Sequence, residues 1–296
     1  MRFWLPLILA LGVGLAAGTP GAAAGDRPVL RVAVLPDQNP ATLRERYNPL
    51  LDHLASACDV TPELVLPADY AGLVKAFTRG RADLGWFGGV TFVMAHRRAG
   101  VDPLVMRDID FRFTSWFIKR ADDPRQSIDA FEDAAFTFGS PLSNSAHLRP
   151  RHFLKRHEGI TAEAFFGSVR YAGAHDAVVR AVVAGRADLG AVNAEVVGAM
   201  QRDGRVDSGA IEVVAKTPPY AAYVWGTRAG MPQKRRTCLR DAFMRLCFVK
   251  PDDRVVLRRL GARTYFPAGI GQYRTLMAIA ERLDVLTMAA GGETAP

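Results

Sequence analysis

Cysteine is scarce, and none of it forms a paired motif. The chain of 296 residues contains three cysteines, Cys58, Cys238 and Cys247, without a Cys-x-x-Cys spacing. This excludes a zinc ribbon and a thioredoxin-type redox centre. On one helix, Cys238 and Cys247 would be about 13 Å apart, whereas a disulfide needs Cα atoms within about 7 Å. We therefore expect both to be unpaired, and Cys58, which follows a helix, to be buried or incidental.

Concentrated positive charge is also missing. The 38 Lys+Arg exceed the 30 Asp+Glu and give a formal charge of +8, yet no run of five basic residues occurs. Proteins that bind nucleic acids usually gather their basic residues into such runs or patches. We expect a solvated, arginine-rich surface and no nucleic-acid partner.

The common catalytic motifs are absent. The sequence contains no G-x-S-x-G, H-E-x-x-H, Walker or G-x-G-x-x-G pattern. His147, His152 and His157 are spaced by five residues, so on a helix successive rings diverge by about 140° and do not converge on one ion. The sequence thus predicts no catalytic residue, no metal site and no cofactor.

A long apolar run occurs only at the start of the chain. Arg2 precedes the apolar residues 3–18, and small residues follow at 22–24. This pattern predicts a secretory signal peptide over 1–24, removed near Ala24, and a periplasmic location. No cysteine lies at the junction, so we do not expect a lipoprotein.

Strands and helices alternate after this segment. Short β-rich runs at 30–35, 61–67 and 82–88 enclose helical patterns at 44–57 and 69–80. Strands that alternate with helices predict a mainly parallel α/β sheet.

A repeated unit predicts two lobes. The string Gly-Arg-Ala-Asp-Leu-Gly occurs at 80–85 and again at 185–190, each time between an amphipathic helix and an apolar strand. Extended segments at 111–120 and 216–227 would connect the lobes twice. We expect lobe 1 over 25–116 and 219–296, lobe 2 over 117–218, and C-terminal helices at 234–248, 252–261 and 271–285.

Polar residues precede a predicted helix in the second lobe. Ser140, Ser143, Asn144 and Ser145 lie just before it, and Pro150 suits its first turn. Free N–H groups, hydroxyls and the helix dipole would favour an anion there. The alternative is that these residues only cap the helix.

Seven segments in order resemble the phosphonate/phosphite/phosphate substrate-binding proteins of ABC transporters, and within them the branch often labelled selenate binders. The resemblance implies a type II periplasmic binding fold, with two α/β lobes joined by two extended hinge segments around a closing cleft. The matching segments are RYNPLLDHL (46–54), ADLGWFGGVTFVMA (82–95), FTSWFI (113–118), FGSPLSNSAHLRPRHFL (138–154), YAGAHDAVVRAV (171–182), ADLGAVNAEV (187–196) and TPPYAAYVW (217–225).

The resemblance also implies a set of ligand-binding residues. This chain differs from the family pattern Ser-Thr-Ser-Gly-His at two positions. Asn144 replaces the threonine and is still a hydrogen-bond donor, whereas Ala146 replaces the glycine and limits close approach of the ligand. An aromatic pair that ends a strand can equally belong to the core. The implied residues are Ser143, Asn144, Ser145, Ala146, His147, Asp176, Trp86, Phe87 and Tyr47.

Asp176 bears on which anion would bind. A carboxylate beside a dianion is repulsive unless one partner carries a proton or an ammonium group, so Asp176 would favour a protonated oxyanion or an amino-bearing phosphonate. The alternative is a helix cap. We expect His175 to make local contacts, while Tyr220, Tyr223 and Trp225 could pack at a hinge or contact ligand.

The sequence as a whole predicts a monomeric, non-enzymatic periplasmic protein. It would capture a small phosphorus oxyanion or phosphonate and deliver it to an ABC permease in the inner membrane. Three alternatives remain: a binder of selenate or sulfate, a ligand sensor that partners a membrane kinase, and an enzyme with Cys58 as nucleophile.

Overall fold

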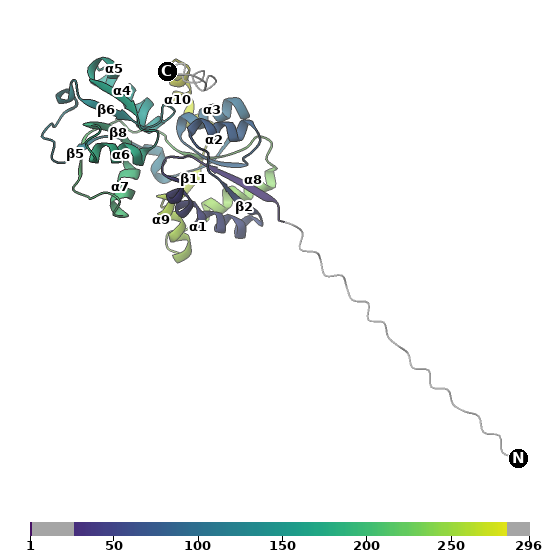
Figure 1. Cartoon of the computed structure of the whole chain (residues 1–296). Coiled ribbons are helices and arrows are strands. Elements are labelled where there is room, and N and C mark those ends of the chain that lie inside the picture. Colours follow the sequence, from purple (N-terminus) through teal and green to yellow (C-terminus); the bar gives the residue numbers. More distant parts are fainter. Residues whose placement is uncertain (2–26, 283–296) are drawn as a thin grey trace.

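Two α/β lobes lie side by side in the computed structural model (Figure 1). The structure describes Met1 and residues 27–282, so the predicted signal segment lies outside the described residues apart from Met1. Within the described part of the chain, no helix is long and apolar enough to cross a membrane.

Lobe 1 is built on a six-stranded sheet of order β11-β4-β10-β3-β1-β2. The first three strands are parallel, and β10 and β11 pair in the antiparallel sense. Helices cover both faces, so the central strands β10 and β3 are buried at every position. The strands are β1 Val29–Val34, β2 Thr61–Val65, β3 Leu84–Phe87, β4 Asp102–Arg107, β10 Val224–Thr227 and β11 Tyr265–Pro267.

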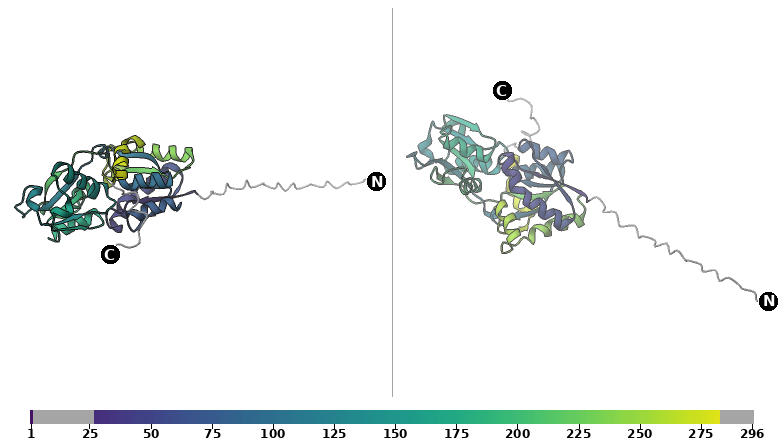
Figure 2. Two further views of the ribbon diagram at one scale, coloured as in Figure 1. Left: turned by 90° about the horizontal axis from the view of Figure 1, so that it is seen from above. Right: turned by 60° about the horizontal axis from the view of Figure 1, so that its bottom comes forward.

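The helices of lobe 1 come from both ends of the chain. Figure 2 shows the C-terminal helices, in yellow and green, against the blue and purple N-terminal elements, because the chain returns to lobe 1 after leaving it. The helices are α1 Pro40–Cys58, α2 Tyr70–Thr78, α3 Gly89–Ala99, α8 Gln233–Met244, α9 Pro251–Leu260 and α10 Arg274–Arg282, with 3-10 turns η1 Asp108–Arg112 and η4 Ile270–Tyr273.

Lobe 2 is built on a five-stranded sheet of order β7-β6-β8-β5-β9. Separate apolar clusters pack on its two faces. Its strands are β5 Ser115–Arg120, β6 Ala135–Phe138, β7 Ser168–Tyr171, β8 Leu189–Asn193 and β9 Ile211–Lys216. Its helices are the 3-10 turn η2 Ile128–Phe131, the π-helical turn η3 Asn144–Leu148, α4 Arg149–His157, α5 Ala162–Phe165, α6 His175–Val183 and α7 Ala194–Arg202.

The chain crosses between the lobes at two adjacent segments. Phe113 and Tyr220 form an antiparallel bridge whose two N–H···O distances are 2.9 and 3.0 Å. The outgoing segment then enters β5, and the returning segment runs from β9 to β10. The boundary expected after residue 116 therefore falls inside β5, which belongs to the sheet of lobe 2.

The two copies of the repeated unit have the same local geometry. Gly80 and Gly185 both have positive φ, +63° and +67°, and end the preceding helix. The aspartates also correspond: Asp83 accepts a hydrogen bond from the backbone N–H of Arg31, and Asp188 accepts one from that of Ala135. The repeat thus fixes how each helix returns to its sheet.

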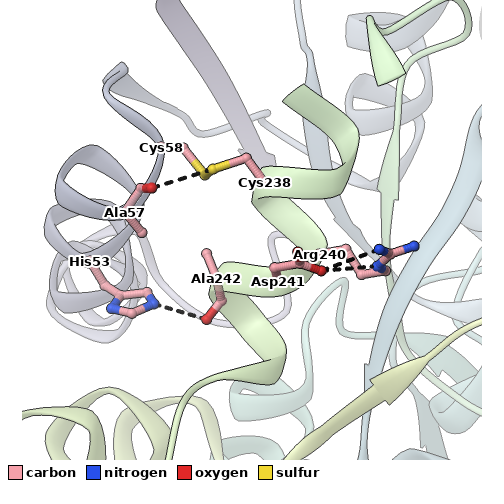
Figure 3. Close-up of a disulfide and its surroundings, with 7 residues drawn as sticks. All are labelled: His53, Ala57, Cys58, Cys238, Arg240, Asp241 and Ala242. Carbon is pink, nitrogen blue, oxygen red and sulfur yellow. Dashed lines mark hydrogen bonds and ion pairs between the residues drawn. A yellow bond between two sulfur atoms is a disulfide. The ribbon is translucent and has the colours of Figure 1, made fainter. Parts of the chain in front are cut away.

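A disulfide corrects the expectation for the cysteines. Cys58 and Cys238 are bonded, with Cα atoms 5.8 Å apart, and join the end of α1 to α8 (Figure 3). The prediction that Cys238 is unpaired and Cys58 incidental was wrong, because it weighed only the spacing along one helix, whereas packing brings residues 180 positions apart together. Cys247 is free and exposed, as expected.

Candidate ligand-binding site

The carboxyl ends of the parallel strands of both lobes meet at the cleft. In lobe 1, β1, β2 and β3 are followed there by Leu35, Tyr70 and Gly88. In lobe 2, β6 leads into the loop that ends at Ser143 and Asn144. Ligands of α/β proteins bind at this edge of the sheet.

An enclosed space lies between these strand ends. Its lining atoms leave no room for a freely placed water molecule, so the lobes are closed on it and must part to admit a ligand. All of its lining residues are uncharged. They are Leu35, Tyr70, Gly88, Gly89, Ser143, Asn144, Ser145, Ala222 and Tyr223.

The lobe 2 wall is the start of a helix. Ser143 caps it, with Oγ accepting from the N–H of Ala146 at 2.9 Å. The first turn is π-helical and continues into α4, where Pro150 lies in the first turn as predicted. No carbonyl within the helix can accept from the N–H groups of Asn144 and Ser145, and π-helical turns often occur at functional sites.

The lobe 1 wall also contains a helix start. Helix α3 follows Gly88, which provides no side-chain cap. A Cβ on Gly89 would lie 2.9 Å from Nδ2 of Asn144, so the absence of a side chain lets the lobes approach. Helix N-termini from both lobes thus face one space, an arrangement that favours an anion.

Two side chains at this space have polar atoms without a partner. The hydroxyl of Tyr70 and both amide atoms of Asn144 are buried and form no hydrogen bond. Burying an unpaired polar group costs about 1–3 kcal/mol, so such groups are rare unless a ligand uses them. Burial raises the pKa of Tyr70 far above its usual value, so the hydroxyl keeps its proton and can donate.

A buried hydrogen-bond network supports Ser145. Nδ1 of His175 accepts from the backbone N–H of Asn193 at 3.2 Å, which leaves the proton of the neutral ring on Nε2. Nε2 lies 3.4 Å from Ser145 Oγ and 3.3 Å from the hydroxyl of Tyr223. Burial lowers the pKa of His175 to about 4, so the ring is neutral at physiological pH.

Asn193 completes this network. Its Nδ2 donates to the Tyr223 hydroxyl at 2.8 Å, and that hydroxyl lies 3.2 Å from Ser145 Oγ. The Tyr223 oxygen therefore accepts from the side chains of lobe 2 and has its own proton left for Ser145 or a ligand. The network joins the returning hinge segment to both the helix start and β8.

Trp86 packs against Tyr223, which lines the enclosed space. Its ring stacks on that of Tyr223 at 5.4 Å, and the guanidinium of Arg107 lies 4.8 Å from the Trp86 ring centroid. Asp110 holds Arg107 through two hydrogen bonds of 2.7 and 2.8 Å. Trp86 thus orients Tyr223 but does not line the space itself.

One carboxyl group lines the adjoining part of the cleft, and a second, on Asp37, is buried between two of its lining residues, Pro36 and Gln38. Asp176 lines a larger, open part of the cleft that adjoins the enclosed space at Tyr70. It binds Arg180 at 2.8 Å through Oδ2, while its buried Oδ1 has no partner. Asp37 of lobe 1 also has an unpartnered Oδ1, and burial raises its pKa.

Only Ser143, Asn144 and Ser145 of the nine expected residues line the enclosed space; Trp86 lies behind Tyr223, Asp176 lines the adjoining open part, and the other four lie elsewhere. Tyr47 packs in the lobe 1 core, 5.9 Å from Trp225, and Phe87 packs on Phe77 at 4.9 Å. Ala146 is buried against Gly139. His147 faces away, because Nδ1 bonds the carbonyl of Pro141 and Nε2 lies near Arg151 and Tyr171; burial lowers its pKa to about 4.

Sequence reasoning missed Tyr70 and Asn193. Tyr70 begins the helix after β2, and Asn193 ends β8, so both lie at the same strand edge as the predicted residues. The available signal was that Asn193 is the polar last residue of an apolar strand and that Tyr70 begins the helix after a strand. His175 was expected to make local contacts, and Tyr223 to pack at a hinge or contact ligand; the structure joins both to Ser145.

The fold and the site define a two-lobed binding protein that closes on a small anion. A family model for periplasmic phosphonate substrate-binding proteins of ABC transporters matches residues 32–273. The chain belongs to this family, whose members are periplasmic substrate-binding proteins and not enzymes.

The chain is also similar to individual phosphite- and phosphonate-binding proteins. The chain is 27% identical over 268 residues to "Probable ABC transporter phosphite binding protein PhnD1" of Prochlorococcus marinus (strain MIT 9301), covering 86% of this chain and 90% of the relative. It is 23% identical over 252 residues to the phosphonates-binding periplasmic protein of Escherichia coli (strain K12), covering 82% and 73%. The solved structure of the Prochlorococcus marinus (MIT 9301) PhnD1 with methylphosphonate matches with a TM-score of 0.82 and 26% identity, covering 88% and 99%.

Proposed function

We propose that this protein captures phosphite or a short alkylphosphonate between its lobes and delivers it to an ABC permease. The observation that carries the proposal is the small enclosed space with unpartnered donors on Tyr70 and Asn144. Its neutral lining suits recognition by oriented dipoles, and its narrowness favours a small ligand that enters while the lobes are apart.

Two carboxyl groups beside this space would select the protonation state of a ligand that extends into the adjoining open part of the cleft, which Asp176 lines. The unpartnered oxygens of Asp37 and Asp176 accept hydrogen bonds but cannot donate them while ionised. Phosphite and alkylphosphonates keep a P–OH proton in mildly acidic solution, and an aminophosphonate carries an ammonium group. Sulfate and selenate have no proton at these pH values, so we expect the site to disfavour them.

Calorimetric titration of the mature, ligand-stripped protein with phosphite, methylphosphonate, phosphate, selenate and sulfate between pH 5 and 8 tests this. We expect phosphite or methylphosphonate to bind at least about 100-fold more tightly than sulfate, a difference of ~2.7 kcal/mol. The preference should increase toward low pH, where more of the ligand retains its proton. Sulfate or selenate binding as tightly would overturn the selection rule while leaving transport of oxyanions intact.

Replacement of Asp176 by Asn separates the carboxylate from the rest of the site. An amide can donate, so D176N should bind sulfate better and lose most of the pH dependence. The matched control is Asp188→Asn, which changes the same charge in lobe 2 at an aspartate that pairs with Arg125 away from the cleft. An unchanged anion preference in D176N would show that Asp176 does not determine which anion binds.

We propose that the protein acts as a monomer after removal of residues 1–24, and that the permease reads the closed arrangement of the lobes. Size-exclusion chromatography with light scattering, and N-terminal sequencing of the periplasmic form, test these two points.

A further inference from the structure

A second, arginine-rich crevice lies between the lobes, away from the enclosed space. Lobe 1 contributes Gln38, helix α1 and the end of α9, and lobe 2 contributes α7 and the loop after it. These helices lie at the facing sides of the two lobes in Figure 1. The crevice shares no lining residue with the enclosed ligand space and leaves about 600 Å³ unfilled, part of it open to solvent.

Positive charge exceeds negative charge in this crevice. Its lining includes five arginines and three carboxylates. Two of these carboxylates are already engaged: Glu195 pairs with Arg107 at 2.7 Å, and Asp203 pairs with Arg205 at 3.1 Å. The charged residues are Arg46, Arg202, Arg205, Arg258 and Arg259 against Glu45, Glu195 and Asp203.

Several of the guanidinium groups lack acceptors. Nη1 of Arg205 is withdrawn from solvent and forms no hydrogen bond. The side chain of Arg46 is only 14% exposed, and the nearest carboxylate oxygen, on Asp37, lies 3.7 Å away. Arg202 and Arg259 are solvent-exposed, and within residues 27–282 neither forms an ion pair. The withdrawn Nη1 of Arg205 is costly unless an acceptor enters the crevice, and the exposed guanidinium groups would add positive charge around such an acceptor.

The crevice also depends on closure of the lobes. Arg205 of lobe 2 donates to Oε1 of Gln38 in lobe 1 at 3.1 Å, so the two walls are in contact. The arginines of α1 and α9 belong to lobe 1, and Arg202 and Arg205 belong to lobe 2. Like charges from opposite lobes repel as the lobes close, and an anion between them would offset that repulsion.

We propose that this crevice is a second anion site, which binds a tetrahedral oxyanion such as sulfate or inorganic phosphate and favours the closed form. Two N–H groups of one guanidinium can donate parallel hydrogen bonds to two oxygens of such an anion. Because the site needs both lobes, the anion and the cleft ligand should each raise the affinity of the other by the same factor.

The test measures sulfate binding to the mature protein with the cleft already filled by saturating methylphosphonate. We expect sulfate to bind this loaded protein with 1:1 stoichiometry. Arg202→Ala combined with Arg259→Ala should weaken this binding at least about fivefold, the lower end of usual coupling and charge effects. The matched control is Arg79→Ala with Arg81→Ala, which removes the same charge from an exposed turn of lobe 1.

The coupling provides a second readout. In wild-type protein, sulfate should tighten methylphosphonate binding about fivefold or more at constant ionic strength, and the Arg202/Arg259 double variant should lose this effect. Loss of all sulfate binding when the cleft is filled, or equal binding by the two double variants, would overturn the proposal.

The proposal for the cleft can fail independently. If the cleft takes no phosphonate, sulfate titration of Tyr70→Phe still separates the sites, because Tyr70 lines the enclosed space and not the arginine crevice. Sulfate binding that depends on Tyr70 but not on Arg202 and Arg259 would assign the anion to the cleft and remove the second site.

Discussion

The two copies of the Gly-Arg-Ala-Asp-Leu-Gly unit build the same turn but present different chemistry to the cleft. In lobe 1, β3 ends in Phe87 and then Gly88 and Gly89, so bare backbone and a helix start face the ligand space. In lobe 2, β8 ends in Asn193, whose amide joins the Ser145 network. The repeat thus supplies a scaffold, and the residues directly after it supply the binding groups.

The lobes also differ in how they are held together. Lobe 1 has one large apolar core, with members from Leu30 to Leu276, and is joined by the Cys58–Cys238 disulfide. Lobe 2 has two smaller cores and no cysteine in residues 117–218. Lobe 1 is therefore the discontinuous lobe that needs a crosslink, and lobe 2 is the continuous one.

The largest effect should come from removing that crosslink. Cys58→Ser with Cys238→Ser opens a loop closed over 180 positions and should cost about 4 kcal/mol of unfolding free energy. Urea denaturation with and without reductant measures the loss. Cys247→Ser is the control and should change stability little. An equal loss in C247S would show that the effect is not due to the crosslink.

Acid should loosen lobe 2 before lobe 1. Burial lowers the pKa of His175 and His147 to about 4, below the ~6.5 of an unfolded chain. Their neutral forms stabilise the fold fully above pH 6.5, and this contribution falls as the pH drops toward 4, by up to ~3 kcal/mol for buried His175. Hydrogen exchange at pH 4.5 should open peptides of 140–193 before those of 29–58, and His175→Gln should reduce the difference.

The repeat glycines should differ in their tolerance of a methyl group. A Cβ at Gly85 would lie 2.5 Å from the Phe87 ring, and one at Gly190 would lie 2.8 Å from Val178. Both Ala variants should lose about 1–3 kcal/mol, with the larger loss in lobe 1, where the contacts are aromatic rings. Gly271→Ala is the thermal-melting control, since nothing lies within 4 Å of its Cβ. Equal melting temperatures for all three would refute the packing argument.

The smallest effect concerns two tyrosines of lobe 1. Tyr70 lines the enclosed space and Tyr47 packs in the core, although both hydroxyls lack a partner. Tyr70→Phe should weaken methylphosphonate binding by about tenfold, ~1.4 kcal/mol, while Tyr47→Phe should change it less than about twofold. Calorimetry on both variants decides which hydroxyl contacts the ligand, and the reverse order would move the ligand toward Tyr47.

Much of the fold followed from local patterns. Apolar runs, turn glycines and the repeat predicted alternating strands and helices, and the C-terminal helices were expected at 234–248 and 252–261, close to α8 and α9. The polar residues before Pro150 predicted a helix start, which the structure has at Asn144. These features depend on residues near one another in the chain, so the sequence displays them directly.

The site was only partly predictable because strand ends far apart in sequence build it. A tyrosine in a helix looks the same in sequence whether it faces a core, as Tyr47 does, or a cleft, as Tyr70 does. Likewise the pairing of Cys58 with Cys238 depends on the packing of α1 against α8.

The sequence by itself determined the α/β class, the duplicated unit and the polar helix start, since each arises from backbone preferences and hydrophobic periodicity along a short segment. The tertiary structure alone decided which donors converge, which aromatic rings support them from behind, and how the arginines of two lobes meet. Those outcomes depend on the packing of two sheets and on closure of the lobes, which bring together residues more than 150 positions apart, such as Gln38 and Arg205.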